Sequence, residues 1–215
     1  MHQLIIECDG LLKDQGFDYA FCGGHALDIH IGRVTRLHGD IDLSVWWEDR
    51  ERIITFMQAQ SWTVYEAMGG GMIRLLTGAS EPERRNLFCV RDDCPFFHVK
   101  PLGEDIYHLR FRHTEQKYLN YIEFLFNMRS GTEFIYGHNE TIHLALSRAI
   151  LRRDGIAYFA PELALLYKSA DLKRKENRRD FDAALPHLSS EGRLWLKSVL
   201  PEGHKWIAKL EEHHV

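Results

Sequence analysis

The stretch from Phe21 to Val45 constrains the fold of this chain more than any other. It reads FCGGHALDIHIGRVTRLHGDIDLSV, with a glycine pair near its start and the alternating run Asp40-Ile41-Asp42-Leu43 near its end. Residues i and i+2 of a strand point to the same face, so a strand here presents two carboxylates side by side. Like charges held that close repel each other unless a cation or proton lies between them. Mg²⁺, a hard cation that prefers oxygen ligands, is therefore the predicted partner of both aspartates.

The glycine pair lies between a predicted strand, 17–22, and a predicted short helix that ends at Gly32. A strand, a turn at Gly23-Gly24 and a helix start together bring backbone N–H groups and the positive end of a helix dipole to one place. That combination is the outline of a phosphate-binding site. Glycine pairs are also common in ordinary turns, so a purely structural turn is the alternative interpretation.

Hydrophobic periodicity predicts the remaining elements. Helical spacing of apolar residues is found early in the chain and again after residue 160, at 2–15, 49–60, 161–170, 178–185, 190–200 and 205–211. Strand patterns dominate the region between, at 41–46, 62–65, 72–76, 87–90, 96–99, 106–111 and 118–126. The pattern predicts an α+β (α/β) fold, with a mixed β-sheet and flanking helices over residues 1–130 and a mainly helical domain over residues 131–215.

Composition excludes several functional classes. The 215 residues are 45% apolar and 27% charged, as in an ordinary globular protein with a sizeable core. The net charge of −4 argues against a general nucleic-acid binder. No run reaches the roughly 20 apolar residues that a membrane span needs. Four cysteines in a chain of this length do not suggest a disulfide framework, so we expect reduced thiols and a cytoplasmic location.

The chemistry-bearing residues follow one another closely. Thr35, Arg36 and His38 stand immediately before the two aspartates. Together with the glycine pair they resemble the opening motif of the nucleotidyltransferase superfamily, in its aminoglycoside and lincosamide adenylyltransferase-like branch. The resemblance continues over residues 121–210, in LSRAILRRDGIAYFAPELALLYKS and RRDFDAALPHLSSEGRLWL. It does not place residues 62–117.

The resemblance implies a nucleotidyltransferase-type fold and a specific reaction. A nucleoside monophosphate, AMP from ATP, is moved onto a hydroxyl of a small acceptor, and pyrophosphate is released. One or two Mg²⁺ ions are expected on Asp40 and Asp42, which are the expected metal ligands and catalytic carboxylates. The predicted nucleotide-binding residues are Gly23, Gly24, Arg36 and Lys168.

The third carboxylate of the superfamily departs from its usual place. In the segment NYIEFLFN, Tyr121 stands where the resemblance expects an acid, and Glu123 follows two residues later on the same strand face. Tyrosine has an ordinary pKa near 10 and is a poor base at neutral pH. Glu123 is therefore the predicted functional acid, as a metal ligand, a general base or an acceptor-binding group.

Several alternatives remain open on the sequence. The chain could be a toxin-like nucleotidyltransferase that modifies tRNA or a protein, or a catalytically silent nucleotide-binding protein of the same fold. Asp28 could orient a neighbouring loop and be structural. Cys89, Cys94 and His98 could form a zinc site, although their spacing favours buried strand cysteines beside a turn.

Overall fold

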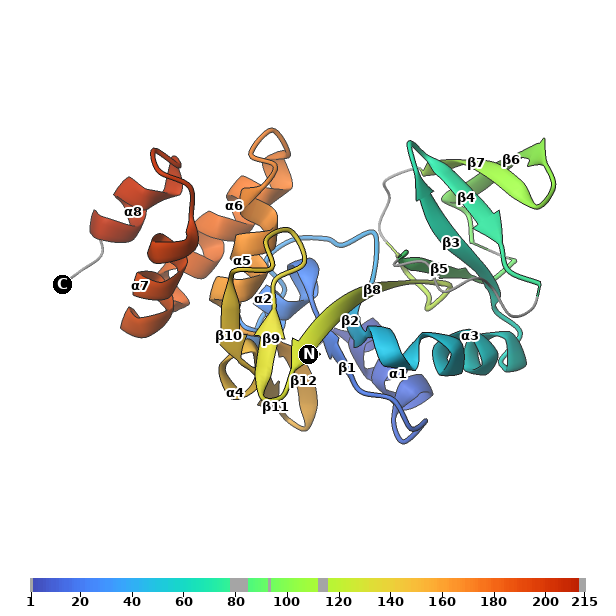
Figure 1. The fold of residues 1–215 in the computed structure, drawn as a ribbon, viewed down its shortest axis with the longest axis horizontal. Coiled ribbons are helices and arrows are strands. Elements are labelled where there is room, and N and C mark those ends of the chain that lie inside the picture. The colour runs from blue at the N-terminus through green and yellow to red at the C-terminus, as the bar shows by residue number, and fades with distance from the viewer. Residues whose placement is uncertain (1, 78–84, 93, 112–115, 213–215) are drawn as a thin grey trace. The chain divides into compact units, whose positions relative to one another are not determined.

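The computed structural model describes residues 2–77, 85–92, 94–111 and 116–212 (Figure 1). These residues form two compact units. The helical unit comprises Ala20–Arg36 and Ser130–Val215, and the sheet unit comprises His2–Tyr19 and Leu37–Arg129. Each unit is built from segments that are distant in sequence, so the chain passes between the units more than once.

The sheet unit is organised around one mixed sheet. Its strands are β2 (Asp42–Trp46), β3 (Thr63–Gly69), β4 (Met72–Leu75), β5 (Leu87–Val90), β6 (Phe97–Gly103), β7 (Ile106–Phe111) and β8 (Tyr121–Ser130). They lie in the order β2-β8-β5-β3-β4-β7-β6. The β2–β8 pair is parallel and every other pair in this order is antiparallel. Two strands that are far apart in the sequence, β2 and β8, are therefore neighbours.

Two helices of the sheet unit carry the apolar spacing seen in the sequence. The helix α1 (Gln3–Leu12) buries four residues on one face, and α3 (Arg50–Ala59) buries Ile53, Ile54 and Met57 and contacts β3. A short 3₁₀ helix, η1 (Trp47–Asp49), joins β2 to α3. Periodicity alone placed both α-helices, because each is amphipathic.

Aromatic side chains fill one part of the sheet unit. A buried cluster brings together five residues of the segment 62–117 and one residue of β8, namely Tyr65, Ile73, Val90, Cys94, Phe96 and Tyr121. Half-buried apolar side chains pack against it, among them Phe88, Phe97, Tyr107 and Phe111. Residues 62–117 therefore build an aromatic core next to β8.

The helical unit contains a smaller set of strands. These are β1 (Tyr19–Phe21), β9 (Glu133–Ile135), β10 (His143–Ala145), β11 (Ile150–Arg153) and β12 (Ile156–Phe159). The strands β11 and β12 form an antiparallel hairpin, and β12 also pairs in parallel with β1 through Phe21 and Tyr158. The strands β9 and β10 form a second antiparallel pair.

The helices of this unit pack mainly on one another. They are α2 (Gly23–Ile31), α4 (Leu146–Ala149), α5 (Pro161–Ser169), α6 (Lys175–Ala184), η2 (Leu185–His187), α7 (Ser190–Val199) and α8 (Trp206–Glu212). The helix α5 contacts α2, α6 and α7, and it begins with Pro161, a residue suited to the first helical turn. Ser189 caps α7 by accepting a hydrogen bond from the Gly192 N–H at 3.0 Å.

The structure confirms the predicted fold class, because it has a mixed sheet, flanking helices and a helical C-terminal region. It corrects two local expectations. Gly23 and Gly24 form the first two residues of α2 and not a separate turn. Residues 133–159, for which no strand was predicted, contain four short strands. The polar segment 78–85, for which the sequence predicts a loop, falls almost wholly outside the described residues. The predicted boundary at residue 130 stays a prediction.

Within the described ranges, no helix combines the length and the apolar character that crossing a lipid bilayer requires.

Candidate active site

Three carboxylates meet at the junction of β2 and β8 in the sheet unit. Asp42 is the first residue of β2 and is the register partner of Glu123 on β8. The Glu123 N–H donates to the Ile41 carbonyl oxygen at 2.8 Å, which extends the ladder to the residue between the two aspartates. Ile41 is fully buried, whereas Asp40, Asp42 and Glu123 are half-buried. Strand alternation therefore buries the isoleucine and leaves the three acids on the other face.

The three acids are close enough to share one cation. One oxygen from each of Asp40, Asp42 and Glu123 lies within 4.8 Å of the others. At that separation two carboxylates repel each other by roughly 3 kcal/mol at an effective dielectric constant of about 20. A half-buried set of oxygen ligands with this much repulsion suits a hard divalent cation such as Mg²⁺. The residues present thus fit the metal that the sequence predicts.

Tyr121 lies beside these acids and does not replace any of them. It is 1% exposed, and its hydroxyl donates to Glu123 Oε1 at 3.1 Å. Burial, followed by the charge of Glu123 and the bond to it, holds the pKa of Tyr121 well above its ordinary value. The hydroxyl therefore stays protonated at neutral pH, and Glu123 is the residue of β8 that joins the aspartates.

The predicted phosphate-binding glycines open a helix in the helical unit. Gly23 has a φ of +60°, a conformation that glycine adopts without strain. The helix α2 ends at Gly32, which has a φ of +87° and forms its C-cap. The N-terminus of α2 is thus placed at the glycine pair, as the sequence motif anticipated, although the glycines belong to the helix itself.

Asp28 holds the loop that follows α2. Its Oδ1 accepts hydrogen bonds from the Thr35 backbone N–H at 2.9 Å and from the Thr35 hydroxyl at 2.6 Å. These two bonds shape the chain immediately before Arg36, which supports the structural interpretation of Asp28.

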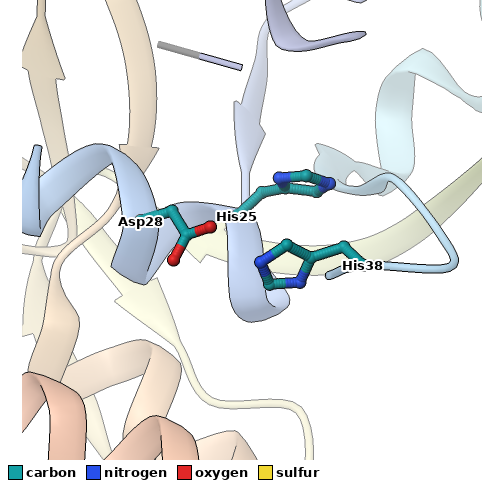
Figure 2. A group of neighbouring side chains, drawn as sticks. All are labelled: His25, Asp28 and His38. Carbon is teal, nitrogen blue, oxygen red and sulfur yellow. The ribbon is translucent and has the colours of Figure 1, made fainter. Parts of the chain in front are cut away.

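Figure 2 shows Asp28 and His25 projecting from α2, together with His38. His25 and Asp28 are both buried, and they are three residues apart on the helix, so their side chains lie on neighbouring turns. His38 belongs to the sheet unit, where it is buried and its carbonyl oxygen accepts from the Gln116 N–H at 3.2 Å.

Arg36 and Lys168 meet at a single buried acid. Arg36 forms a bidentate salt bridge with Asp180, in which Nε donates to Oδ1 at 2.7 Å and Nη2 donates to Oδ2 at 3.0 Å. Lys168 Nζ lies 2.8 Å from the same Oδ2. Asp180 is 2% exposed. Burial acts to raise its pKa, but the hydrogen bond from Arg36 and the charge of Lys168 outweigh burial and hold that pKa below the ordinary value. Asp180 thus holds the two positively charged side chains next to each other.

The sequence predicted Arg36 and Lys168 as nucleotide-binding residues but missed Asp180 as the residue that joins them. A signal was present. The buried face of α6 consists of Asn177, Asp180, Phe181 and Ala184, so Asp180 is a charged residue on the inner side of an amphipathic helix. Charged residues are almost never fully buried unless they are paired. The pattern therefore indicates a buried partner, although not which one.

The alternative zinc site gains no support in the described part of the chain. Cys89 and Cys94 are buried and unoxidised. Burial raises the pKa of the Cys89 thiol, which disfavours the thiolate that zinc requires. Neither cysteine belongs to the groups of potential metal ligands found among the described residues.

Comparisons with known proteins find one family model and several solved structures that this chain resembles. A family model for aminoglycoside-2''-adenylyltransferases matches residues 4–69. The solution structure of the antibiotic-resistance factor ANT(2'')-Ia is 14% identical, with a TM-score of 0.53 over 98% of this chain and 95% of that one. The lincomycin-bound lincosamide adenylyltransferase LnuA is 12% identical, with a TM-score of 0.54 over 85% of this chain and 95% of that one.

A second structure of ANT(2'')-Ia, in complex with adenylyl-2''-tobramycin, is 12% identical, with a TM-score of 0.51 over 91% of this chain and 95% of that one. A sequence comparison with curated proteins gives no match. The structural likenesses show that the chain has the nucleotidyltransferase fold. The family model thus supports the predicted resemblance over residues 4–69, and the structural relatives support it at the level of the fold.

Proposed function

We propose that this chain is a Mg²⁺-dependent nucleotidyltransferase that moves AMP from ATP onto a hydroxyl of a small acceptor. The observation that carries the proposal is the group of three carboxylates, Asp40, Asp42 and Glu123, whose oxygens lie within 4.8 Å of one another on one sheet face. Their placement by strand register, and not by chance surface proximity, favours a built metal site.

Asp40 and Asp42 are the proposed metal ligands. A bound Mg²⁺ supplies charge neutralisation for the triphosphate oxygens and lowers the pKa of an acceptor hydroxyl near it. Phosphoryl transfer requires little covalent chemistry from the protein. The main role of these two carboxylates is therefore to keep their negative charges in a fixed position at the site. Strand alternation around the buried Ile41 provides that rigidity.

Glu123 is the proposed general base. The acceptor hydroxyl oxygen forms a bond to the α-phosphorus of ATP, and the bond from that phosphorus to the oxygen bridging it to the β-phosphate breaks. The electron pair of the broken bond leaves with pyrophosphate. The proton of the acceptor hydroxyl passes to the Glu123 carboxylate. AMP then remains attached to the acceptor oxygen.

The nucleotide contacts are proposed for the helical unit. Gly23 and Gly24 begin α2, where backbone N–H groups and the helix dipole attract phosphate oxygens. Arg36 and Lys168 add positive charge, and Asp180 fixes both of them. Two positively charged side chains held next to each other support a contact with the anionic triphosphate.

The acceptor is proposed to be a small hydroxylated molecule in the cytoplasm. ANT(2'')-Ia has been solved with adenylyl-2''-tobramycin and LnuA with lincomycin, so proteins of this fold accept antibiotics of two chemical classes. Those two compounds are the natural first acceptors to try, and an RNA acceptor is the competing possibility.

The experiment measures pyrophosphate release from ATP or CTP with Mg²⁺ and tobramycin, lincomycin or total tRNA as acceptor. Wild-type protein should release pyrophosphate with ATP and a small acceptor, and EDTA should stop the release. Asp42→Asn should abolish it, whereas Asp105→Asn, which removes an exposed carboxylate of the same unit, should not.

Each contrary result has a clear meaning. Pyrophosphate release that requires tRNA, and not tobramycin or lincomycin, would show that the acceptor is RNA. A protein that is stabilised by nucleotide in a thermal-shift assay but releases no pyrophosphate would be the silent nucleotide-binding protein. Full activity in Asp42→Asn would overturn the metal assignment.

A further inference from the structure

Tyr121 and Glu123 lie next to each other on one face of the sheet. They are two residues apart on β8, so their side chains point to the same side. Glu123 pairs with Asp42 on β2 and with Phe88 on β5, while Tyr121 pairs with Val90 on β5. The face that carries the acids is therefore continuous with the aromatic cluster, and Tyr121 stands at the border between them.

The ring of Tyr121 is held on several sides. Its centroid lies 5.2 Å from the Phe111 ring, 5.5 Å from Phe97 and 5.8 Å from Phe96. The Phe88 ring lies 6.3 Å away. Interiors packed in this way leave side chains in one rotamer. The position of the Tyr121 hydroxyl is thus set by the surrounding rings and does not depend on Glu123.

The hydroxyl is the part of Tyr121 that packing does not explain. The four surrounding residues are phenylalanines, and a fifth phenylalanine would fill the same space without a polar atom. Burying a hydroxyl costs free energy unless it is hydrogen-bonded. Here its bond goes to Glu123 Oε1 at 3.1 Å. The bond is charge-assisted, because the acceptor is a carboxylate, and such bonds are the stronger class.

We propose that Tyr121 is a positioning residue whose hydroxyl, fixed by the aromatic cluster, holds the Glu123 carboxylate in one orientation toward Asp40 and Asp42. The inference rests on the proposed function for its kinetic consequence but not for its geometry. It also gives residues 62–117 a role, since Phe88, Phe97 and Phe111 come from three strands of that segment.

The test uses the full chain and two matched variants. Tyr121→Phe removes the hydroxyl and keeps the ring. Tyr65→Phe removes a hydroxyl from the same buried cluster, at a residue that pairs with Phe88 and not with an acid. Thermal unfolding of both variants shows whether the two deletions disturb the fold to the same extent.

Crystal structures of the wild type and both variants give the first readout. The Glu123 carboxylate should change rotamer or occupy several conformers in Tyr121→Phe and keep its wild-type conformation in Tyr65→Phe. A Glu123 side chain that keeps one unchanged rotamer in all three structures overturns the proposal. This readout needs neither metal nor activity, so it remains decisive even if the wild type releases no pyrophosphate and the proposed function fails.

Steady-state kinetics of pyrophosphate release give the second readout. Loss of one hydrogen bond to a charged group should lower kcat of Tyr121→Phe by about 10- to 100-fold. KM for ATP should stay within about twofold, because the hydroxyl orients the base and does not bind nucleotide. Tyr65→Phe should keep its kcat. Equal kcat values for the two variants, or a loss that appears only in KM, would contradict a positioning role.

Discussion

Asp180→Asn should destabilise the protein strongly, because Asp180 is the single carboxylate between two cations. The wild-type side chain is 2% exposed and makes three contacts of 2.7, 3.0 and 2.8 Å with Arg36 and Lys168. Breaking a buried ion pair by removing one partner costs about 3–5 kcal/mol. Arg36 and Lys168 are 20% and 12% exposed and gain some hydration, so we expect a loss near the lower end, about 3 kcal/mol.

The measurement is urea and thermal unfolding, with a control two residues away. A loss of about 3 kcal/mol lowers Tm by roughly 6–12 °C in a chain of this size. Asp182→Asn makes the same substitution on the same helix, but Asp182 and its partner Lys209 are 58% and 51% exposed. Exposed pairs contribute at most about 1 kcal/mol. If the two variants lose the same small amount, the buried network does not stabilise the fold as argued.

The effect of Asp180→Asn should also depend on pH. The folded pKa of Asp180 is lower than its unfolded value, so its stabilisation is present above the ordinary aspartate pKa of about 3.9. That stabilisation is lost as the pH falls through the lower, folded pKa. The gap in unfolding free energy between wild type and Asp180→Asn should therefore narrow below about pH 4. A gap of constant size from pH 7 to pH 3 would refute the assignment.

Two further variants test the framework around the sites. Glu66→Ala should cost about 3 kcal/mol, because it removes the buried carboxylate that contacts Arg50 at 2.9 Å and Arg74 at 3.0 Å, while Arg50, itself 2% exposed, keeps its 2.7 Å contact with the exposed Glu51; urea unfolding measures the loss, and a change below 1 kcal/mol would show that the network is dispensable. Gly32→Ala should cost about 1–2 kcal/mol, because Gly32 has a φ of +87° that a Cβ disfavours; unchanged thermal stability would contradict a required left-handed C-cap.

Much of the local structure could be predicted because local structure follows from short-range periodicity. The helices α1, α3 and α5 to α8 lie close to their predicted positions, since each has an apolar face at helical spacing. The strands of residues 133–159 were not predicted, because they are three or four residues long and too short for a periodic pattern. The turn predicted at Gly23-Gly24 is instead the start of α2, since a helix start and a turn look alike over two glycines.

The candidate site, like the fold, could be predicted only in part from the sequence. The sequence alone determined that Asp40 and Asp42 share a face, because a strand repeats every two residues and Ile41 between them is apolar. It also placed Arg36 close to them along the chain. It also predicted Glu123 as the third acid. What remained open was whether Glu123 acts as a metal ligand, a general base or an acceptor-binding group, what Asp28 does, and how Lys168 relates to Arg36.

Tertiary structure decided those points. The parallel register of β2 and β8 brings Glu123 opposite Asp42, although 80 residues separate them, and leaves Tyr121 as its hydrogen-bond donor. The pairing of Arg36 with Asp180 spans an even longer stretch of chain. Strand register and buried ion pairs depend on contacts between distant segments, and the energy of such contacts leaves no periodic trace in the sequence. The two aspartates and Glu123 were therefore predicted from the sequence, but the register that brings Glu123 opposite Asp42 and the hydrogen bond from Tyr121 were not.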